Sequence, residues 1–390
     1  MKLLYLHQHF STPAGSTATR SFAMARALTQ RGHAVTLACG QYAGAVTGLT
    51  GAFRHGRREG LVAGFRVVEF GIPCGNAQSL PARMLAFLRF AARAALLARG
   101  ERFDLVIASS TPLTVALPAL AARAPFIFEI RDPWPELPRA MGGVPAPLLW
   151  LMDRLANAAC RRARAVIALS EGMAETARAR GAAAVHVIPN GADLDLFGPH
   201  VAPWRPEGAA LPIAVYAGAH GTANGLDMLL DAAALCRDAG LRILLVGEGR
   251  EKPRLMARAA AENLPNITFL DPMPKAELAR LLSGAQIGLH LLADVPEFAE
   301  FTAPNKLMDL LAAGLPVVSN APGHAARCLQ DGPSGIPVRD AASMAAALRA
   351  LAADPQSRAA MGQAARAQAV RRWDRRLQSR SFCEVIEHAA

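Results

Sequence analysis

Short apolar runs, separated by segments of helical periodicity, fill the first half of this 390-residue chain. A run of four to eight apolar residues bounded by turn residues predicts a buried strand, whereas apolar residues three or four apart predict a helix. The sequence predicts a helix at 20–30 and strands at 2–6, 34–39, 61–70, 103–108, 126–130, 165–169 and 185–188. Such alternation favours a mostly parallel sheet covered on both faces.

A second series of strands follows a segment that is rich in proline and glycine, and we interpret residues 196–211 as a linker. A long helix is expected at 364–388, and strands are predicted at 213–217, 241–246, 267–270, 287–291, 317–320 and 335–338. The predicted fold class is α/β, with doubly wound domains at 1–195 and 212–365 and a terminal helix within 366–390. Ligands are then expected at the carboxyl ends of the strands.

Composition is consistent with two ordinary cores, since 52% of the residues are apolar. The six cysteines form no C-x-x-C pair, which predicts a reducing compartment and argues against a zinc site. The first residues carry too short an apolar run for a signal peptide. No uncharged apolar run reaches 18 residues, so we expect no membrane-spanning helix.

Positive charge is concentrated in the first half of the chain. Residues 1–195 carry 22 lysines and arginines against 12 acidic residues, whereas residues 196–390 carry 20 against 19. This asymmetry indicates an anionic partner for the first domain. Residues 83–99 form a basic, apolar helix candidate that can lie on an anionic membrane, although an ordinary layer helix with solvated arginines is the more frequent case.

The most informative tract is Thr302–Ser319, in which Lys306 and Asp309 precede an Ala-Ala-Gly-Leu-Pro corner and an apolar strand. A lysine where a loop enters a helix can join backbone N–H groups in holding a phosphate. Asp309, almost one turn further on, can accept hydrogen bonds from ribose hydroxyls. With Asn305, the tract resembles the Pro-Asn-Lys-Leu-x-Asp/Glu nucleotide-sugar signature of retaining family 4 glycosyltransferases.

The first loop, residues 7–20, places Gly15 and the Ser16 hydroxyl near a helix N-terminus, which suits an anion or a sugar, although ordinary capping explains the hydroxyls equally well. It lacks the G-x-G-x-x-G dinucleotide fingerprint. With residues 31–36 it resembles the opening of family 4 enzymes, where the loop lines the cleft under the donor. His7 and His9 alternate at the end of the first strand, and we expect structural roles for them.

The Arg131-Asp132-Pro-Trp-Pro-Glu tract follows a predicted strand, and its prolines stiffen the loop. Asp132 can orient a sugar hydroxyl or accept its proton, whereas a structural ion pair with Arg131 is the alternative. The tract resembles the branch of family 4 that builds O-antigens and capsules with N-acetyl-L-fucosamine-type sugars. Many members have a histidine in place of Arg131, so the resemblance leaves the catalytic base open. We select Asp132, Arg131 and Lys306 as catalytic residues.

The resemblance implies a donor site in the second domain. Its first loop contains Gly218, His220 and Gly221, and His220 stands near a position where many members have a phosphate-binding arginine. Further donor-binding residues are expected in the next loops. These are Gly247 and Glu248 after the second strand, Met273 in the segment whose backbone reads the base, and Glu300 in place of the first family glutamate, eight residues before Asp309, where this chain has Phe301.

The resemblance also implies the GT-B fold, with two Rossmann-like domains facing a central cleft and a terminal helix that packs back on the first. The expected activity is of the hexosyltransferase type (EC 2.4) and retaining. The expected donor is a nucleoside-diphosphate sugar, most commonly a UDP-sugar, and the acceptor is a lipid-linked sugar or a glycan. We expect no metal or other cofactor, and a cytoplasmic location at the inner face of the membrane.

Alternative functions stay open at this point. A nucleotide-sugar 2-epimerase shares the architecture but converts its donor without an acceptor. An NAD-dependent oxidoreductase is also doubly wound, but the glycine spacing of the first loop argues against it. A non-enzymatic protein that binds anionic membranes or nucleic acid would also explain the positive charge. The chain lacks aromatic–basic interleaving and known nucleic-acid-binding motifs, so we expect no nucleic-acid partner.

Overall fold

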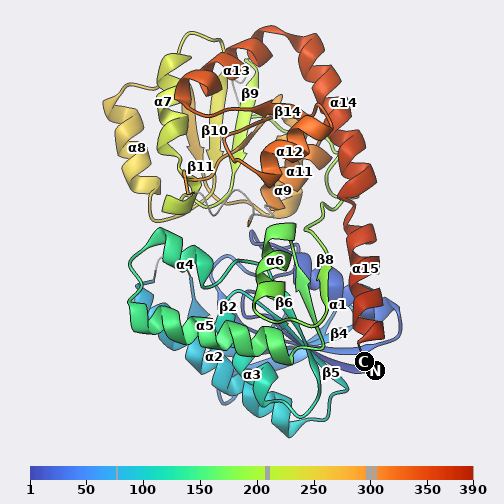
Figure 1. The fold of residues 1–390 in the computed structure, drawn as a ribbon. Coiled ribbons are helices and arrows are strands. Elements are labelled where there is room, and N and C mark those ends of the chain that lie inside the picture. Colours follow the sequence, from blue (N-terminus) through green and yellow to red (C-terminus); the bar gives the residue numbers. More distant parts are fainter. Residues whose placement is uncertain (76–77, 207–210, 296–300, 302–304, 390) are drawn as a thin grey trace. The chain divides into compact units, whose positions relative to one another are not determined.

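The computed structural model describes residues 1–75, 78–206, 211–295, 301 and 305–389 (Figure 1). The chain divides into two compact units. Unit 1 comprises Met1–Pro189 and Leu377–Ala390, and unit 2 comprises Asn190–Arg376. The sequence places the corresponding limits at residues 195, 211 and 365.

Unit 1 is built on one eight-stranded sheet in the order β3-β4-β2-β1-β5-β6-β7-β8. All neighbouring strands are parallel except the β3–β4 pair. Its strands are β1 Lys2–Leu6, β2 Ala34–Tyr42, β3 Arg57–Val62, β4 Phe65–Cys74, β5 Leu105–Ser109, β6 Phe126–Ile130, β7 Ala165–Ala168 and β8 Val185–Val187. Its helices are α1 Arg20–Gln30, α2 Leu80–Gly100, η1 Leu113–Val115, α3 Ala116–Ala121, α4 Glu136–Met141, α5 Ala146–Arg162, α6 Glu171–Ala179 and most of α15 Arg375–His388.

Unit 2 is built on one six-stranded parallel sheet in the order β11-β10-β9-β12-β13-β14. Its strands are β9 Ile213–Ala217, β10 Arg242–Val246, β11 Ile267–Leu270, β12 Ile287–His290, β13 Val317–Ser319 and β14 Gly335–Pro337. Its helices are η2 Thr222–Asn224, α7 Asp227–Leu235, α8 Lys252–Ala261, α9 Lys275–Gly284, α11 Asn305–Ala312, α12 His324–Asp331, α13 Ala341–Ala353 and α14 Pro355–Arg372. Two doubly wound α/β units confirm the predicted fold class.

The strand order determines where ligands bind in each unit. In unit 1 the chain runs outward from β1 through β2 and then returns to β5 on the other side of β1. In unit 2 it runs from β9 through β10 and β11 and then returns to β12 beside β9. Such a reversal opens a crevice at the carboxyl ends of the two central strands. The loops after β1 and β5, and those after β9 and β12, therefore line these crevices.

The single strand predicted at 61–70 is wrong, because the chain forms a hairpin there. Val62 pairs with Phe65, so the connection between β3 and β4 has two residues. Ala63 and Gly64 both have positive φ, at 50° and 92°, which matches the twist of a tight hairpin turn. Alanine rarely adopts this conformation, so the sequence carried only a weak turn signal.

The single terminal helix predicted at 364–388 is also wrong. It breaks at Trp373 and Asp374 into α14 and α15. The carbonyl of Trp373 accepts a hydrogen bond from the Ala192 N–H at 2.7 Å, and the Arg375 N–H donates to the Ala192 carbonyl at 2.9 Å. This strand-like bridge takes the groups that a continuous helix would use. In unit 1, Phe382 of α15 stacks on Tyr5 with ring centres 6.0 Å apart.

None of the described helices combines the length and apolarity that crossing a bilayer requires.

We expect Ala63→Asn to stabilise unit 1 by about 1 kcal/mol, because asparagine tolerates the left-handed conformation that alanine disfavours. For a unit of this size the melting temperature should rise by about 2–4 °C in calorimetry of the full chain. Ala183→Asn is the matched control, since Ala183 is also exposed but is not among the positive-φ residues. An unchanged or lower melting temperature for Ala63→Asn would contradict the turn assignment.

Candidate functional site

The loops that follow β9 and β10 meet backbone to backbone at the carboxyl edge of the unit 2 sheet. A Cβ atom on Gly247 would lie 1.9 Å from the Gly218 carbonyl oxygen, and one on Gly249 would lie 2.3 Å from the carbonyl oxygen of His220. The Gly218 N–H donates to the Val246 carbonyl at 2.9 Å. Because side chains are excluded at Gly247 and Gly249, the two loops form a tight backbone cradle.

Lys306, on the first turn of α11 after Asn305, reaches into this cradle. Its Nζ donates to the Tyr216 hydroxyl at 2.8 Å and to Oδ1 of Asn224 at 2.6 Å. A Cβ atom on Gly218 would lie only 2.3 Å from Cε of Lys306. Burial lowers the pKa of Lys306 to about 7, and no carboxylate of the described residues pairs with it. A buried cation with only neutral partners favours the binding of an anion.

Asp309, nearly one turn after Lys306, is buried and pairs with Lys275, the first residue of α9. Its Oδ2 accepts from Lys275, whereas Oδ1 has no partner in the described part of the chain. Lys275 Nζ also lies 5.4 Å from the centre of the Phe197 ring. Oδ1 of Asp309 is therefore the oxygen that remains for the predicted contact with a ribose hydroxyl. Sequence reasoning missed Lys275, because no local motif signals a pair formed across 34 residues.

His220 is fully buried, and neither of its ring nitrogens has a partner among the described residues. Burial, together with the nearby charges of Lys252 and Lys306, lowers the pKa of His220 to about 4. The ring is therefore neutral near pH 7, so it can form a hydrogen bond but adds no positive charge. Its backbone N–H donates to the Glu248 carbonyl and its carbonyl accepts from the Glu251 N–H, both at 2.9 Å.

The other predicted donor-binding residues lie around the same edge. The Glu248 side chain is mostly exposed and contacts Lys252 at 3.5 Å. Met273 is half-buried against the core of unit 2. Gly221 has room for a Cβ atom, since the nearest atom to it would be Nδ2 of Asn224 at an ordinary contact distance of 3.8 Å. Glu300 lies outside the described residues.

In unit 1, Arg131 is oriented by a histidine from the end of β1. Its Nη1 bonds to Nε2 of His7 at 2.6 Å, and Nδ1 of His7 bonds to the Ser21 hydroxyl at 2.7 Å. Burial first, and then the charge of Arg131, lowers the pKa of His7 well below its usual value. We therefore assign a neutral ring that accepts from Arg131 and donates to Ser21. The structural role expected for His7 includes this connection, which the sequence did not reveal.

A buried ion pair lies beneath Arg131. Glu129 of β6 accepts from Arg20 Nε at 2.9 Å and from the hydroxyls of Ser109 and Tyr5 at 2.5 and 3.2 Å. Burial alone would raise the pKa of Glu129, but Arg20, Arg131 and the Ser109 hydrogen bond outweigh it and hold the pKa below its usual value. This network ties α1 to the carboxyl ends of β5 and β6.

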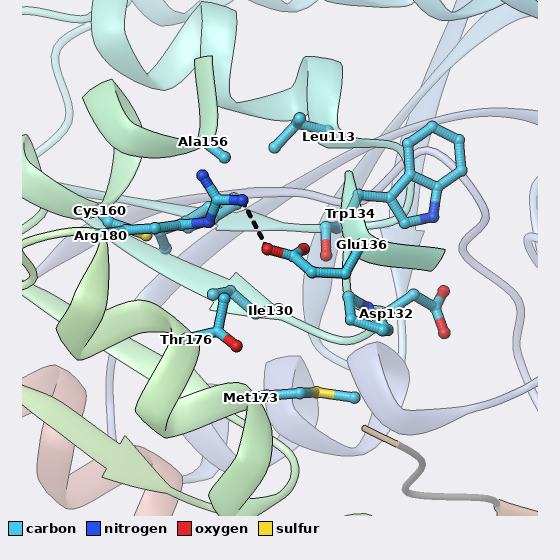
Figure 2. Close-up of a pocket in the computed structure, with 13 residues that line it drawn as sticks. Leu113, Ile130, Asp132, Trp134, Glu136, Ala156, Cys160, Met173, Thr176 and Arg180 are labelled. Atoms are coloured by element: carbon cyan, nitrogen blue, oxygen red, sulfur yellow. Dashed lines mark hydrogen bonds and ion pairs between the residues drawn. The ribbon is translucent and has the colours of Figure 1, made fainter. Parts of the chain in front are cut away.

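Asp132 is exposed and accepts a hydrogen bond from the Thr111 hydroxyl rather than pairing with Arg131. It borders a pocket between β6, α5 and α6 whose walls include Ile130, Trp134 and Met173. An ion pair between Arg180 and Glu136, 2.5 Å long, lies along this pocket. The carboxylate of Asp132 points away from this ion pair (Figure 2). Asp132 therefore offers carboxylate oxygens to a ligand at the rim of the pocket.

The first loop packs on a neighbouring turn of unit 1. A Cβ atom on Gly15 would lie 2.3 Å from the Ser11 hydroxyl and 2.9 Å from the Gly44 carbonyl, so close packing alone requires this glycine. Ser16 is exposed, and its hydroxyl donates to the same carbonyl at 3.2 Å. A donor contact by Gly15 or Ser16 stays a prediction.

An Asp-x-Asp triplet, a spacing that can mark a metal site, occurs at Asp193-Leu194-Asp195. Asp193 accepts from the backbone N–H groups of Asp195 and Leu196, and Asp195 pairs with Arg376. No group of three histidine, cysteine or acidic side chains lies together among the described residues in a way that could hold a metal ion. The triplet therefore has a local structural explanation, and the expectation of no metal stays a prediction.

Two family profiles match this chain, one over much of each unit. The profile of Glycosyltransferase Family 4 matches residues 17–196, and that of Glycosyl transferases group 1 matches residues 211–354. The chain is 31% identical over 159 residues to a protein of Escherichia coli K12 named as the colanic acid biosynthesis glycosyl transferase WcaI, covering 38% of each chain. It is 33% identical over 201 residues to D-inositol 3-phosphate glycosyltransferase of Kribbella flavida, covering 47% of this chain and 46% of that protein. The matches thus span less than half of these relatives.

Solved structures resemble nearly the whole chain. Sucrose-phosphate synthase of Thermosynechococcus elongatus superposes with a TM-score of 0.76 at 18% identity, over 99% of this chain and 98% of that one. Anabaena Alr3699/HepE, solved with UDP and glucose, gives 0.69 at 20% identity over the full length of both. At these identities the likeness establishes the fold, and it confirms the GT-B class of two Rossmann-like sheets.

Gly218→Ala should reduce the affinity for UDP about as much as Lys306→Met does, because the new Cβ atom displaces the lysine side chain. We expect losses of about 100-fold for each variant, and little further loss when they are combined, because both act on one interaction. Gly221→Ala is the matched control in the same loop and should lose far less. Calorimetric titration of UDP into the parent protein and the four variants measures these losses, and additive losses in the double variant would contradict the shared cause.

The affinity for a UDP-sugar should fall as the pH rises above about 7. Below that value Lys306 is charged in both the free and the bound protein. Above it, the free lysine is neutral and must take up a proton to meet the pyrophosphate, so affinity falls by up to about tenfold per pH unit. Titration between pH 6 and 9 measures this slope, and Lys306→Met should remove it. A flat profile for the unsubstituted protein would contradict the burial of this cation.

Proposed function

Since profiles of Glycosyltransferase Family 4 and of Glycosyl transferases group 1 match residues 17–196 and 211–354, we propose that this chain is a family 4 glycosyltransferase. It transfers a sugar from a nucleoside-diphosphate donor to an acceptor hydroxyl, with retention at the anomeric carbon. Unit 2 takes the donor, because its cradle and its strand reversal lie at the same sheet edge. Unit 1 takes the acceptor, and Asp132 and Arg131 face that substrate from the end of β6.

A single observation carries the proposal. Lys306 is a cation that reaches between the glycine loops, and within the described part of the chain its ammonium group bonds to only two oxygens, both of them neutral. A donor pyrophosphate supplies the missing negative charge, and the leaving diphosphate carries more of it as the sugar–phosphate bond breaks. An ammonium already in place at that position stabilises the transition state more than the ground state.

The finer assignment concerns the substrates. We propose a UDP-sugar donor, which the likeness to a protein solved with UDP supports. The acceptor is a lipid-linked sugar or a glycan in cell-surface polysaccharide synthesis, which the similarity to a protein named for colanic acid biosynthesis supports. The tract from Arg131 to Glu136 favours the branch that handles N-acetyl-L-fucosamine-type sugars.

The proposed roles in unit 1 follow from proton chemistry. Asp132 orients the acceptor hydroxyl and receives its proton as the new bond to the anomeric carbon forms, since its carboxylate is exposed and, of the residues that the structure describes, only Thr111 donates a hydroxyl to it. Arg131 holds an anionic or hydroxyl group of the substrate, because a guanidinium offers five N–H donors in a fixed fork. We place the protein in the cytoplasm, because its six cysteines are all free and buried. No metal is assigned a role.

Radiolabelled UDP-sugars incubated with the protein and a membrane extract should transfer label to a lipid or glycan fraction. Lys306→Ala should lower the rate by about 10²–10³, the cost of losing one group that stabilises developing negative charge. Asp132→Asn should lower the rate while leaving UDP affinity unchanged, because Asp132 belongs to the acceptor side.

Lys2→Ala is the control, because Lys2 is the one lysine of the sequence outside unit 2. Conversion of a UDP-sugar to its 2-epimer without acceptor would instead establish the epimerase alternative. Near-normal transfer by Lys306→Ala would remove the observation that carries the proposal.

A further inference from the structure

Helices α2, α3 and α5 lie side by side over one face of the unit 1 sheet (Figure 1). We call their solvent side the outer helical face. It carries large apolar side chains that are exposed to water, and these are Leu85, Leu88, Leu96, Leu117, Trp150 and Leu151. Scattered exposed leucines are normal, but a group on three adjacent helices marks an interaction surface.

Helix α2 is apolar on both sides. Phe87, Phe90 and Leu97 are buried against the sheet. Leu88 and Leu96, exposed by 50% and 71%, lie on the opposite side of the same helix. The outer side of α2 therefore presents exposed leucines among its arginines, and this combination indicates a partner that takes both apolar and basic side chains. The solvated-arginine alternative for this segment therefore does not account for the exposed leucines.

Helix α5 continues the same surface with an aromatic residue. Trp150 is 56% exposed, next to exposed Leu151. The guanidinium of Arg154 stacks over the Trp150 ring at 4.8 Å. Tryptophan with an adjacent cation suits the boundary between lipid headgroups and acyl chains, because the ring has an apolar body and a polar N–H.

The charge of this surface selects its occupant. Helices α2 and α3 contain no acidic residue, and the one acid of α5, Asp153, already pairs with Arg139 and Arg180. Exposed arginines on and beside these helices have no carboxylate partner among the described residues, and these are Arg89, Arg99, Arg123 and Arg162. A second copy of the chain would bring like charges together, and a nucleic acid would leave the leucines in water.

We propose that the outer helical face seats unit 1 on an anionic lipid bilayer, with the leucines and Trp150 among the upper acyl chains and the arginines at the headgroups. The inference deepens the proposed function, since it explains how the protein reaches a lipid-linked acceptor. Only the identity of this acceptor is taken from the proposed function, and the bilayer surface itself is argued from unit 1 alone.

Vesicle sedimentation of the full-length protein tests the proposal. We expect binding to phosphatidylcholine vesicles that contain phosphatidylglycerol, weakening with salt, and no binding to phosphatidylcholine alone. The triple variant Leu88→Ser, Leu96→Ser, Trp150→Ser should bind at least tenfold more weakly. Arg89→Gln with Arg99→Gln should lose about fivefold per arginine. Leu61→Ser is the matched control, because Leu61 is 80% exposed on β3 of the same unit and should bind normally.

Fluorescence gives a second readout. Lipids brominated in the upper acyl chain should quench the protein, and Trp150→Phe should remove most of that quenching. Melting temperatures close to that of the parent show that the variants fold, as expected for exposed side chains.

The outcomes separate the two proposals. Three outcomes would overturn the bilayer surface. The first is equal vesicle binding by the parent and all variants, and the second is binding to DNA instead of vesicles. The third is a parent protein that binds no vesicles but forms a dimer, which the triple variant no longer forms. A triple variant that no longer binds vesicles but still transfers sugar to a soluble glycan acceptor would support the bilayer surface. Vesicle binding without any sugar transfer would overturn the proposed function alone.

Discussion

The carboxyl edge of the unit 2 sheet contains ammonium groups placed at helix N-termini, where helix electrostatics disfavours a cation. Lys252 and Lys275 are the first residues of α8 and α9, and Lys306 is the second residue of α11. A helix N-terminus carries a partial positive charge, so a cation there costs stability. The first two lysines each have an aspartate partner that offsets this cost. Lys306 has only the oxygens of Tyr216 and Asn224 among the described residues, so its charge is compensated fully only when an anion binds.

Lysine is rare in this chain, and most of its lysines lie at this sheet edge. The sequence contains 38 arginines but only four lysines, and three of those lysines stand at this one sheet edge. A guanidinium is broad and planar, whereas an ammonium is compact. The cradle admits only the compact group, because Lys306 already lies too close to Gly218 for even a Cβ atom there. Arginine is therefore the general cation of this protein, and Lys306 occupies a position where space is limiting.

The sequence allowed the doubly wound α/β fold to be predicted, because local periodicity encodes the order of strands and helices. It also allowed Lys306 and Asp309 to be placed at the start of a helix, because one continuous tract contains them both. It did not allow the partners of those residues to be predicted. His7 meets Arg131 across 124 residues and Lys275 meets Asp309 across 34, and each pair forms only when separate strands align. The hairpin turn at Ala63 was missed for a different reason, since its residue type does not favour its backbone conformation.

The contacts of unit 1 restrict which group can take a proton there. A guanidinium group offers donors and no acceptor, so Arg131 cannot act as a base. His7 occupies the place at the end of β1 from which a base could act, but Arg131 and Ser21 use both of its ring nitrogens, and its lowered pKa makes it a weak base. Asp132 is then the residue of this group whose oxygens are exposed to a substrate. The Arg20–Glu129 pair is buried beneath them. Arg131 and Asp132 do not pair with each other, because Arg131 bonds to His7 and Asp132 accepts from the Thr111 hydroxyl.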